Sequence, residues 1–367
     1  MPTSPALRVS RVLAKLEPGG AQLSVLRVVR ALEAEGIGSR LLVGWASPEG
    51  LALARRMGVA VEVYGDAGDL QWRADAGFAR WLAPRVAGAP VVHAHMFGAW
   101  WAAAQVVGET TALVASEHNA LTWPHGRPAV NLRATLERVD RFYAHGPGAR
   151  RAVLAAGLPP SRMWPGTSPV ADLDAEPLAG LARPRIVFAG RLHPEKGPDV
   201  LVDALARVPG APPALLLGGG AMRPQLEAQI VRLGLGDRVR LVGWQNRPGP
   251  WIAGAAMLVV PSRDEAWSQT AVLGMALGVP VIGTDVDGFP ETLAAGRGLI
   301  VAAEDPGALA TAIADLLTGR RRTDLAGARA YARRFSAENV TASYASAYRE
   351  LGLGAARLAL TTTVHAS

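Results

Sequence analysis

The chain of 367 residues contains no cysteine, which excludes disulfide bonds, thiolate nucleophiles and zinc–thiolate sites. Lysine is nearly absent as well, because Lys15 and Lys196 are the only two. The formal charge of +7 therefore rests on arginines, and these form no basic stripe interleaved with aromatics, so we expect no nucleic-acid partner. No run of about 18 apolar residues occurs, and residues 1–13 lack a signal-peptide pattern. We therefore expect a cytoplasmic protein without a transmembrane segment, and peripheral contact with anionic lipid stays open.

What the chain does contain is a regular alternation of apolar strands and helices. Half of its residues are hydrophobic, glycine and proline interrupt it at short intervals, and its length favours two domains. One of the predicted helices covers Gln71 to Val86. Strands that alternate with helices in this way indicate an α/β protein with parallel sheets.

The stretch from Val259 to Glu291 is the most informative part of the sequence. An apolar strand ends at Pro261, a polar loop follows, and a helix begins near Ser268. Such a loop lies at the carboxyl end of a parallel sheet, where ligands bind, and the start of the helix suits a phosphate. Asp264 and Glu265 in the loop can accept hydrogen bonds from neutral hydroxyl groups. Phosphate and hydroxyls together indicate a sugar nucleotide.

A second loop of the same half carries two cations. Arg191 and Lys196 lie five residues apart in the sequence GRLHPEKG, directly after an apolar strand. Two cations in a glycine-flanked loop can hold a diphosphate. Because arginine is the usual cation of this chain, the lysine suggests a need for a compact ammonium group.

The N-terminal half offers weaker signals. Gly19 and Gly20 follow the first strand and precede a helix, an arrangement that lets a ligand approach the backbone but also occurs in ordinary tight turns. His93, His95 and His118 lie at or just past predicted strand ends. Each could hydrogen-bond a sugar hydroxyl or a phosphate as a neutral imidazole, or each could be a structural histidine. We expect no metal site, because no carboxylate cluster accompanies them.

These stretches resemble the family-four retaining glycosyltransferases of the GT-B fold. The resemblance rests on PSRDE, MALG and VPVIGTDVDGFPE within residues 261–291, on GRLHPEKG at 190–197, and on the GGA loop at 19–21. It implies an α/β protein with two Rossmann-like parallel-sheet domains facing a central cleft, and a C-terminal helix that crosses back to the N-terminal domain. It also implies transfer from a nucleoside-diphosphate sugar, UDP- or GDP-linked, to a hydroxyl acceptor, with retention and with neither metal nor cofactor.

The resemblance also implies roles for particular residues. His118 and Glu265 would contact the transferred sugar as the catalytic residues. The donor would be held by the remaining matched positions, which are Gly19, Gly20, Arg191, Lys196, Trp267, Ser268, Gln269, Thr270 and Glu291.

The chain departs from the family pattern at Leu273. The family has a second glutamate at this position, which binds the two ribose hydroxyls, and a leucine cannot do so. Asp264, Ser268, Gln269 or Glu291 would have to compensate.

Composition and resemblance together predict the domain boundaries. The residues from 158 onward are rich in proline, glycine and alanine, which is typical of a linker. The predicted parts are an acceptor-side domain at 1–164, a linker at 165–184, a donor domain at 185–334, a returning helix at 335–354 and a loosely held tail at 355–367.

The acceptor is not defined by any motif. Trp100, Trp101, Trp123 and His125 either line an acceptor groove or belong to the core. Three hypotheses therefore stay open. The acceptor is a small-molecule natural product or polysaccharide precursor, or the protein glycosylates lipid at a membrane surface, or it binds sugar nucleotides without turnover because of the change at Leu273.

Overall fold

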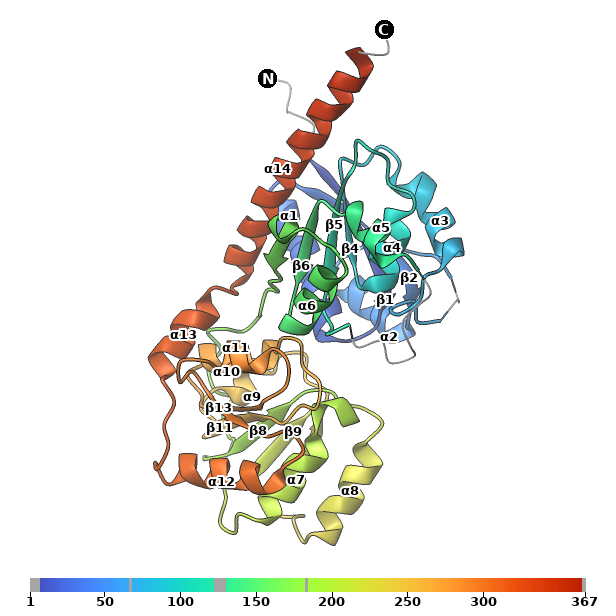
Figure 1. Cartoon of the computed structure of the whole chain (residues 1–367). Coiled ribbons are helices and arrows are strands. Elements are labelled where there is room, and N and C mark those ends of the chain that lie inside the picture. Colours follow the sequence, from blue (N-terminus) through green and yellow to red (C-terminus); the bar gives the residue numbers. More distant parts are fainter. Residues whose placement is uncertain (1–6, 66–67, 122–129, 182–183, 365–367) are drawn as a thin grey trace. The chain divides into compact units, whose positions relative to one another are not determined.

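The computed structural model describes residues 7–65, 68–121, 130–181 and 184–364, with the side chains of the last helix described as far as residue 352 (Figure 1). The chain forms two compact units. Unit 1 comprises residues 1–169 and 337–367, and unit 2 comprises residues 170–336. No helix in the described part of the chain is both long and apolar enough to span a membrane.

Unit 1 is built on a parallel sheet that has seven strands in the described residues. Its order is β3-β2-β1-β4-β5-β6-β7. The strands are β1 (Arg8–Leu16), β2 (Gly38–Ala46), β3 (Val61–Val63), β4 (Val91–His95), β5 (Ala112–Glu117), β6 (Arg141–Ala144) and β7 (Met163–Pro165). The winding direction reverses between β1 and β4, so the carboxyl ends of these two strands flank a switch point.

Helices cover both faces of this sheet. They are α1 (Gly20–Ala34), α2 (Pro48–Arg56), α3 (Ala76–Val86), α4 (Phe97–Ala104), α5 (Leu132–Glu137) and α6 (Pro147–Ala155), with a 3-10 turn at Pro160–Arg162. The helix predicted from Gln71 begins later, at Ala76, because the Asp75 carboxylate caps it by accepting the N–H of Phe78 at 2.8 Å. Strand β7 covers the end of the predicted acceptor-side domain and the first residue of the predicted linker.

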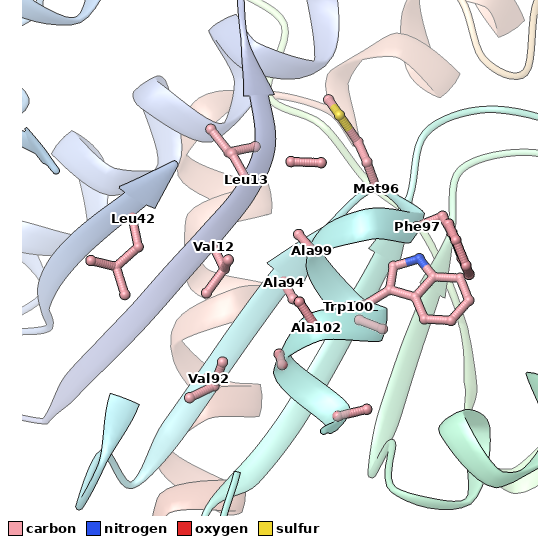
Figure 2. Close-up of a cluster of buried hydrophobic side chains, with 14 of the residues drawn as sticks. Val12, Leu13, Leu42, Val92, Ala94, Met96, Phe97, Ala99, Trp100 and Ala102 are labelled. Carbon is pink, nitrogen blue, oxygen red and sulfur yellow. The ribbon is translucent and has the colours of Figure 1, made fainter. Parts of the chain in front are cut away.

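The main core of unit 1 lies between the sheet and α4 (Figure 2). Trp100 and Phe97 of α4 are fully buried, and their rings meet edge to face with centroids 4.9 Å apart. Trp100 is therefore a core residue rather than part of an acceptor groove. Trp101 packs at the edge of the same cluster. Trp123 and His125 lie outside the described residues.

Helix α14 (Ala337–Val364) belongs to unit 1 although it ends the chain, which confirms the predicted return of a C-terminal helix. In Figure 1 it runs alongside α1. Val340, Tyr344 and Tyr348 of α14 join Val28 of α1 and Val9 of β1 in one buried cluster. The helix continues past residue 354, where the sequence predicted a tail, because residues 355–364 contain neither proline nor glycine to end it.

Unit 2 repeats the architecture with a six-stranded parallel sheet in its described residues. The order is β10-β9-β8-β11-β12-β13, and the winding reverses between β8 and β11. The strands are β8 (Ile186–Ala189), β9 (Ala214–Leu217), β10 (Val239–Gly243), β11 (Met257–Val260), β12 (Val281–Thr284) and β13 (Leu299–Val301). The helices are α7 (Pro198–Ala206), α8 (Arg223–Arg232), α9 (Gly249–Ile252), α10 (Gln269–Ala276), α11 (Phe289–Thr292), α12 (Pro306–Leu317) and α13 (Leu325–Arg333).

Candidate active site

At the switch point of unit 2 the loop after β8 lies against the loop after β11. Gly197 makes this approach possible: its φ of +60° is left-handed, and a Cβ there would come within 2.0 Å of the Pro261 carbonyl oxygen. The backbone N–H of Arg263 donates to the Glu195 carbonyl at 2.8 Å. The two predicted donor loops are therefore joined through backbone contacts.

Arg263 locks these loops with its side chain. Its guanidinium donates to both oxygens of Asp199, at 3.0 and 2.8 Å, and to the Pro194 carbonyl at 2.6 Å. It also pairs with Glu304 at 2.6 Å. The hydrogen bonds to Asp199 and, after them, to Glu304 raise the pKa of Arg263. Sequence reasoning did not single out this residue, although it lies in the PSRDE stretch of the loop after β11.

Lys196 and Glu265 form the centre of the site. The Lys196 Nζ lies 3.0 Å from Glu265 Oε2, and both side chains are mostly buried, with 21% and 12% exposed. The Ser262 hydroxyl donates to the same carboxylate oxygen at 3.3 Å. Lys196 also reaches the Asp264 carbonyl at 3.5 Å. An ammonium has three N–H donors, so one remains for a ligand.

Arg191 takes a different position from Lys196. Its side chain is 44% exposed and pairs with Glu195 of the same loop. His193 approaches the other oxygen of Glu195 at 3.7 Å. Arg191 thus provides a solvent-accessible cation beside the partly buried one.

The start of α10 follows the β11 loop directly. Ser268 is buried and caps the helix, because its Oγ accepts the N–H of Ala271 at 3.2 Å. Gln269 and Thr270 are half-buried residues of the first turn, and Trp267 before them packs on Phe335 with ring centroids 4.9 Å apart. The N–H groups of a helix start, together with its dipole, favour an anion.

Two further positions belong to the predicted donor site. Leu273 is only 4% exposed and belongs to an apolar cluster of unit 2, so the position of the family's second glutamate is part of the core in this chain. Glu291 is an exposed residue of α11. Helix α11 starts against the loop after β11. A Cβ on Gly288, the residue before α11, would come within 1.8 Å of the Ala266 carbonyl oxygen.

In unit 1 the predicted Gly19–Gly20 turn lies at the carboxyl end of β1, beside the switch point. Gly19 precedes α1 with extended backbone (φ −170°), and Gly20 is the first residue of the helix and is exposed. The turn thus presents its backbone at the start of a helix, as an anion site requires.

The three predicted histidines lie together on neighbouring strands, and His145, which the sequence analysis did not single out, joins them. The rings stack in sequence: His93 on His95 at 4.1 Å between centroids, His95 on His118 at 5.5 Å, and His118 on His145 at 4.0 Å. Burial lowers the pKa of all four rings, that of His118 to about 4, so they are neutral at physiological pH. Arg11, a charge within an apolar strand, is a further buried member that sequence reasoning missed.

Glu117 shapes the turn that carries His118. Its buried carboxylate accepts the N–H groups of His118 at 3.0 Å and Asn119 at 3.2 Å, the Asn119 amide at 3.1 Å and the Trp100 indole at 3.2 Å. Burial raises the pKa of Glu117 to about 7, against the lowering effect of these four donors. Within the described residues, no group of three or more potential ligands is arranged to hold a metal ion.

Comparison with solved structures defines the class of fold. The structure of HepE from Anabaena in complex with UDP matches with a TM-score of 0.73 at 20% identity, covering 94% of this chain and 100% of that one. Sucrose-phosphate synthase from Thermosynechococcus elongatus matches with a TM-score of 0.69 at 22% identity, covering 98% and 100%. These likenesses confirm the predicted GT-B fold.

Sequence comparison defines the family. The models of "Glycosyltransferase Family 4" and "Glycosyl transferases group 1" match residues 18–165 and 183–319. D-inositol 3-phosphate glycosyltransferase 2 of Catenulispora acidiphila is 32% identical over 73% of this chain and 67% of that protein. The D-inositol 3-phosphate glycosyltransferase of Jonesia denitrificans is 35% identical over 46% of this chain and 44% of that protein, less than half its length. The chain belongs to the family-four, group 1 glycosyltransferases.

Proposed function

We propose that this protein transfers a sugar from a UDP- or GDP-linked donor to a hydroxyl of an acceptor, with retention of configuration and without a metal ion. The observation that carries the proposal is the Lys196–Glu265 pair beside the start of α10 at the switch point of unit 2. A cation, the start of a helix with its dipole and a carboxylate at one place suit a diphosphate that is bonded to a polyhydroxylated ring.

The chemistry follows from these groups. Negative charge develops on the nucleoside diphosphate as it leaves, and Lys196, Arg191 and the first N–H groups of α10 stabilise it. Glu265 accepts hydrogen bonds from sugar hydroxyls and so orients the ring. His118, being neutral, contributes a hydrogen bond rather than a charge. No protein nucleophile is assigned.

Ribose recognition has to differ from the family pattern. Leu273 is packed in the core, and Ser268 already caps α10. The exposed carboxylates of Asp264 and Glu291 are the candidates that replace the second glutamate. For the acceptor, we propose a hydroxylated small molecule or a polysaccharide precursor; the relatives named for inositol 3-phosphate make that compound and unphosphorylated inositol the first to try.

A thermal-shift panel tests donor binding. UDP-, GDP-, ADP- and TDP-sugars are added without metal to the wild type, Lys196→Ala and a control, Arg223→Ala, which removes only an exposed pair on α8. At a hundredfold excess over Kd, a ligand stabilises the folded state by about 2.7 kcal/mol. One nucleotide class should raise the Tm of the wild type and the control but not of Lys196→Ala.

Release of nucleoside diphosphate and mass spectrometry of the product then test transfer to each acceptor. A protein whose Tm no nucleotide sugar raises would contradict the proposal. Binding without transfer to any acceptor would favour the non-catalytic alternative that the change at Leu273 raises.

A further inference from the structure

A chain of hydrogen bonds joins the buried Arg11 to His118. Arg11 NH1 lies 3.3 Å from His95 Nε2, and His95 Nδ1 lies 3.2 Å from His118 Nε2. Arg11 and His95 are 1% and 3% exposed, so water does not compete for the contact between them. This series of hydrogen bonds crosses from β1 through β4 to the residue after β5.

The guanidinium of Arg11 fixes the direction of each hydrogen bond in this series. A guanidinium is always charged and can only donate. His95 Nε2 must therefore accept from Arg11, which places the single proton of the neutral ring on Nδ1. That Nδ1–H can only donate, so His118 Nε2 accepts, and the proton of the neutral His118 ring lies on Nδ1.

A second set of contacts starts from the same guanidinium. Arg11 NH2 donates to the Tyr348 hydroxyl at 2.6 Å, and the hydroxyl lies 2.5 Å from His93 Nδ1. The Tyr348 oxygen accepts from Arg11 and keeps a second lone pair, so its contact with His93 Nδ1 can run in either direction. The other nitrogen of this ring, Nε2, lies 2.7 Å from Ser116 Oγ. Tyr348 belongs to α14, so this second set of contacts reaches the C-terminal helix.

We propose that Arg11 is a positioning residue that fixes His118 in the Nδ1–H tautomer, so that His118 presents a neutral N–H donor to an oxygen of the bound substrate. With Nε2 already accepting from His95, the ring has no free nitrogen that could act as a general base. The role towards the substrate rests on the proposed function, whereas the tautomer does not.

The groups around His118 favour the same state. On its own segment the Glu117 carboxylate is engaged with backbone N–H groups of the turn, and His145 stacks on the ring from the strand beyond. Arg11 and His93 contact His95, the ring next to His118. Protonation would put a second positive charge near Arg11 and would turn His118 Nε2 into a donor facing the donor of His95.

Long-range ¹H–¹⁵N correlation spectra of the imidazole rings in the ¹⁵N-labelled full chain at pH 7.5 test the tautomers directly, with His118→Gln used for assignment. A free imidazole in water favours the Nε2–H form. The wild type should instead show Nδ1–H for His118 and His95. An Nε2–H form of His118 in the wild type would overturn the proposal, whether or not any variant folds.

Two variants test the two sets of hydrogen bonds one at a time. Arg11→Met should return His118 towards the Nε2–H form, whereas Tyr348→Phe should release only His93 and leave the His118 pattern as in the wild type. Arg11→Lys, which keeps a donor, should partly restore the His118 pattern. If His118 keeps Nδ1–H in a folded Arg11→Met protein, Arg11 does not fix it and the proposal fails.

Kinetics provide an independent readout once a donor and an acceptor are known. Arg11→Met should lower kcat by up to about a hundredfold, the cost of a misplaced group at the reacting centre, with a smaller change in the KM for the donor. The wild-type profile of kcat/KM should show no ionisation of His118 between pH 6 and 8. An ionisation in that range that His118→Gln abolishes would overturn the neutral-donor role. Correct tautomers without any donor binding would contradict the proposed function alone.

Discussion

The two units share one topology but differ in the kind of polar group that they place at the switch point. In unit 2 the groups are ions in pairs that reach solvent, such as Arg191 with Glu195 and Lys196 with Glu265. In unit 1 they are stacked neutral imidazoles next to the buried Arg11, and His93 among them packs on Tyr344 and Tyr348 of α14. The same scaffold can therefore supply solvent-reaching ion pairs in one unit and neutral imidazoles in the other, because burial lowers the pKa of a histidine and so favours its neutral form.

Lowering the pH should produce the largest difference in stability between the two units. The pKa of each of the four buried histidines lies below the value of about 6.5 expected in the unfolded chain. The unfolded chain therefore binds more protons, and stability is lost as pH falls from about 6.5 towards 4, the folded-state value of His118. Glu117 acts in the opposite sense between about 7 and 4.5, but it is one group against four.

Hydrogen exchange between pH 7 and 4.5 checks this expectation. Amides of β4 to β6 should lose protection before those of β8 to β12. The described histidine of unit 2, His193, is half exposed and offers no comparable buried site. Equal loss of protection in both units, or earlier loss in unit 2, would show that the imidazole cluster does not determine acid stability.

Two tryptophans allow the packing of the two units to be compared. Trp100 of unit 1 is fully buried, whereas Trp244 of unit 2 is 46% exposed and donates to Asn246. Trp100→Ala should lower the free energy of unfolding by about 3–5 kcal/mol through loss of burial and cavity formation. Trp244→Ala should change it by about 0.5 kcal/mol or less. Urea denaturation of both variants gives the values, and similar losses would mean that Trp244 is packed more firmly than its exposure indicates.

A glycine pair tests how closely the loops of unit 2 approach each other. Gly197→Ala should cost about 1–3 kcal/mol, because alanine disfavours the left-handed backbone and its Cβ would meet the Pro261 carbonyl. Donor binding should weaken with it, since Lys196 is the preceding residue. Gly219→Ala is the matched control, since nothing lies within 4 Å of its Cβ position. Thermal unfolding and donor titration measure both effects; a Gly197→Ala protein that matches the control would refute the close contact.

The smallest expected effect concerns the clamp between these loops. Arg263→Ala removes the bidentate bond to Asp199 and should cost about 1 kcal/mol, because the pair is partly exposed to solvent. Arg320→Ala, which removes an exposed pair with Asp315, should cost less. The donor Kd should rise for Arg263→Ala and stay unchanged for Arg320→Ala. Isothermal titration distinguishes the two variants, and equal Kd values would remove Arg263 from the site.

Much of the fold could be predicted from the sequence, because the signals that predict it are local. Apolar runs and glycine or proline interruptions predicted strands, loops and the two-domain α/β class. The spacing of Arg191, Lys196 and Glu265 pointed to the loops that the fold brings together at one switch point. Parallel sheets place the carboxyl ends of neighbouring strands at one edge, so such loops meet whatever the rest of the chain does.

Other features depended on contacts between distant segments. The α3 start at Asp75 followed from a side-chain cap, and the burial of Trp100 from the packing of α4 on the sheet. Leu273 could be named as a departure from the family pattern, but only its neighbours show that it is a core residue.

The amino-acid sequence by itself predicted the class of fold and the two candidate donor loops, because hydrophobic periodicity and turn residues act over a few positions. Only the tertiary structure decided the protonation and orientation of the histidines. Arg11 and His95 come from two strands, His118 follows a third, and Tyr348 comes from the last helix. Their charges and tautomers depend on mutual burial and on the direction of each hydrogen bond, and neither exists until the chain has folded.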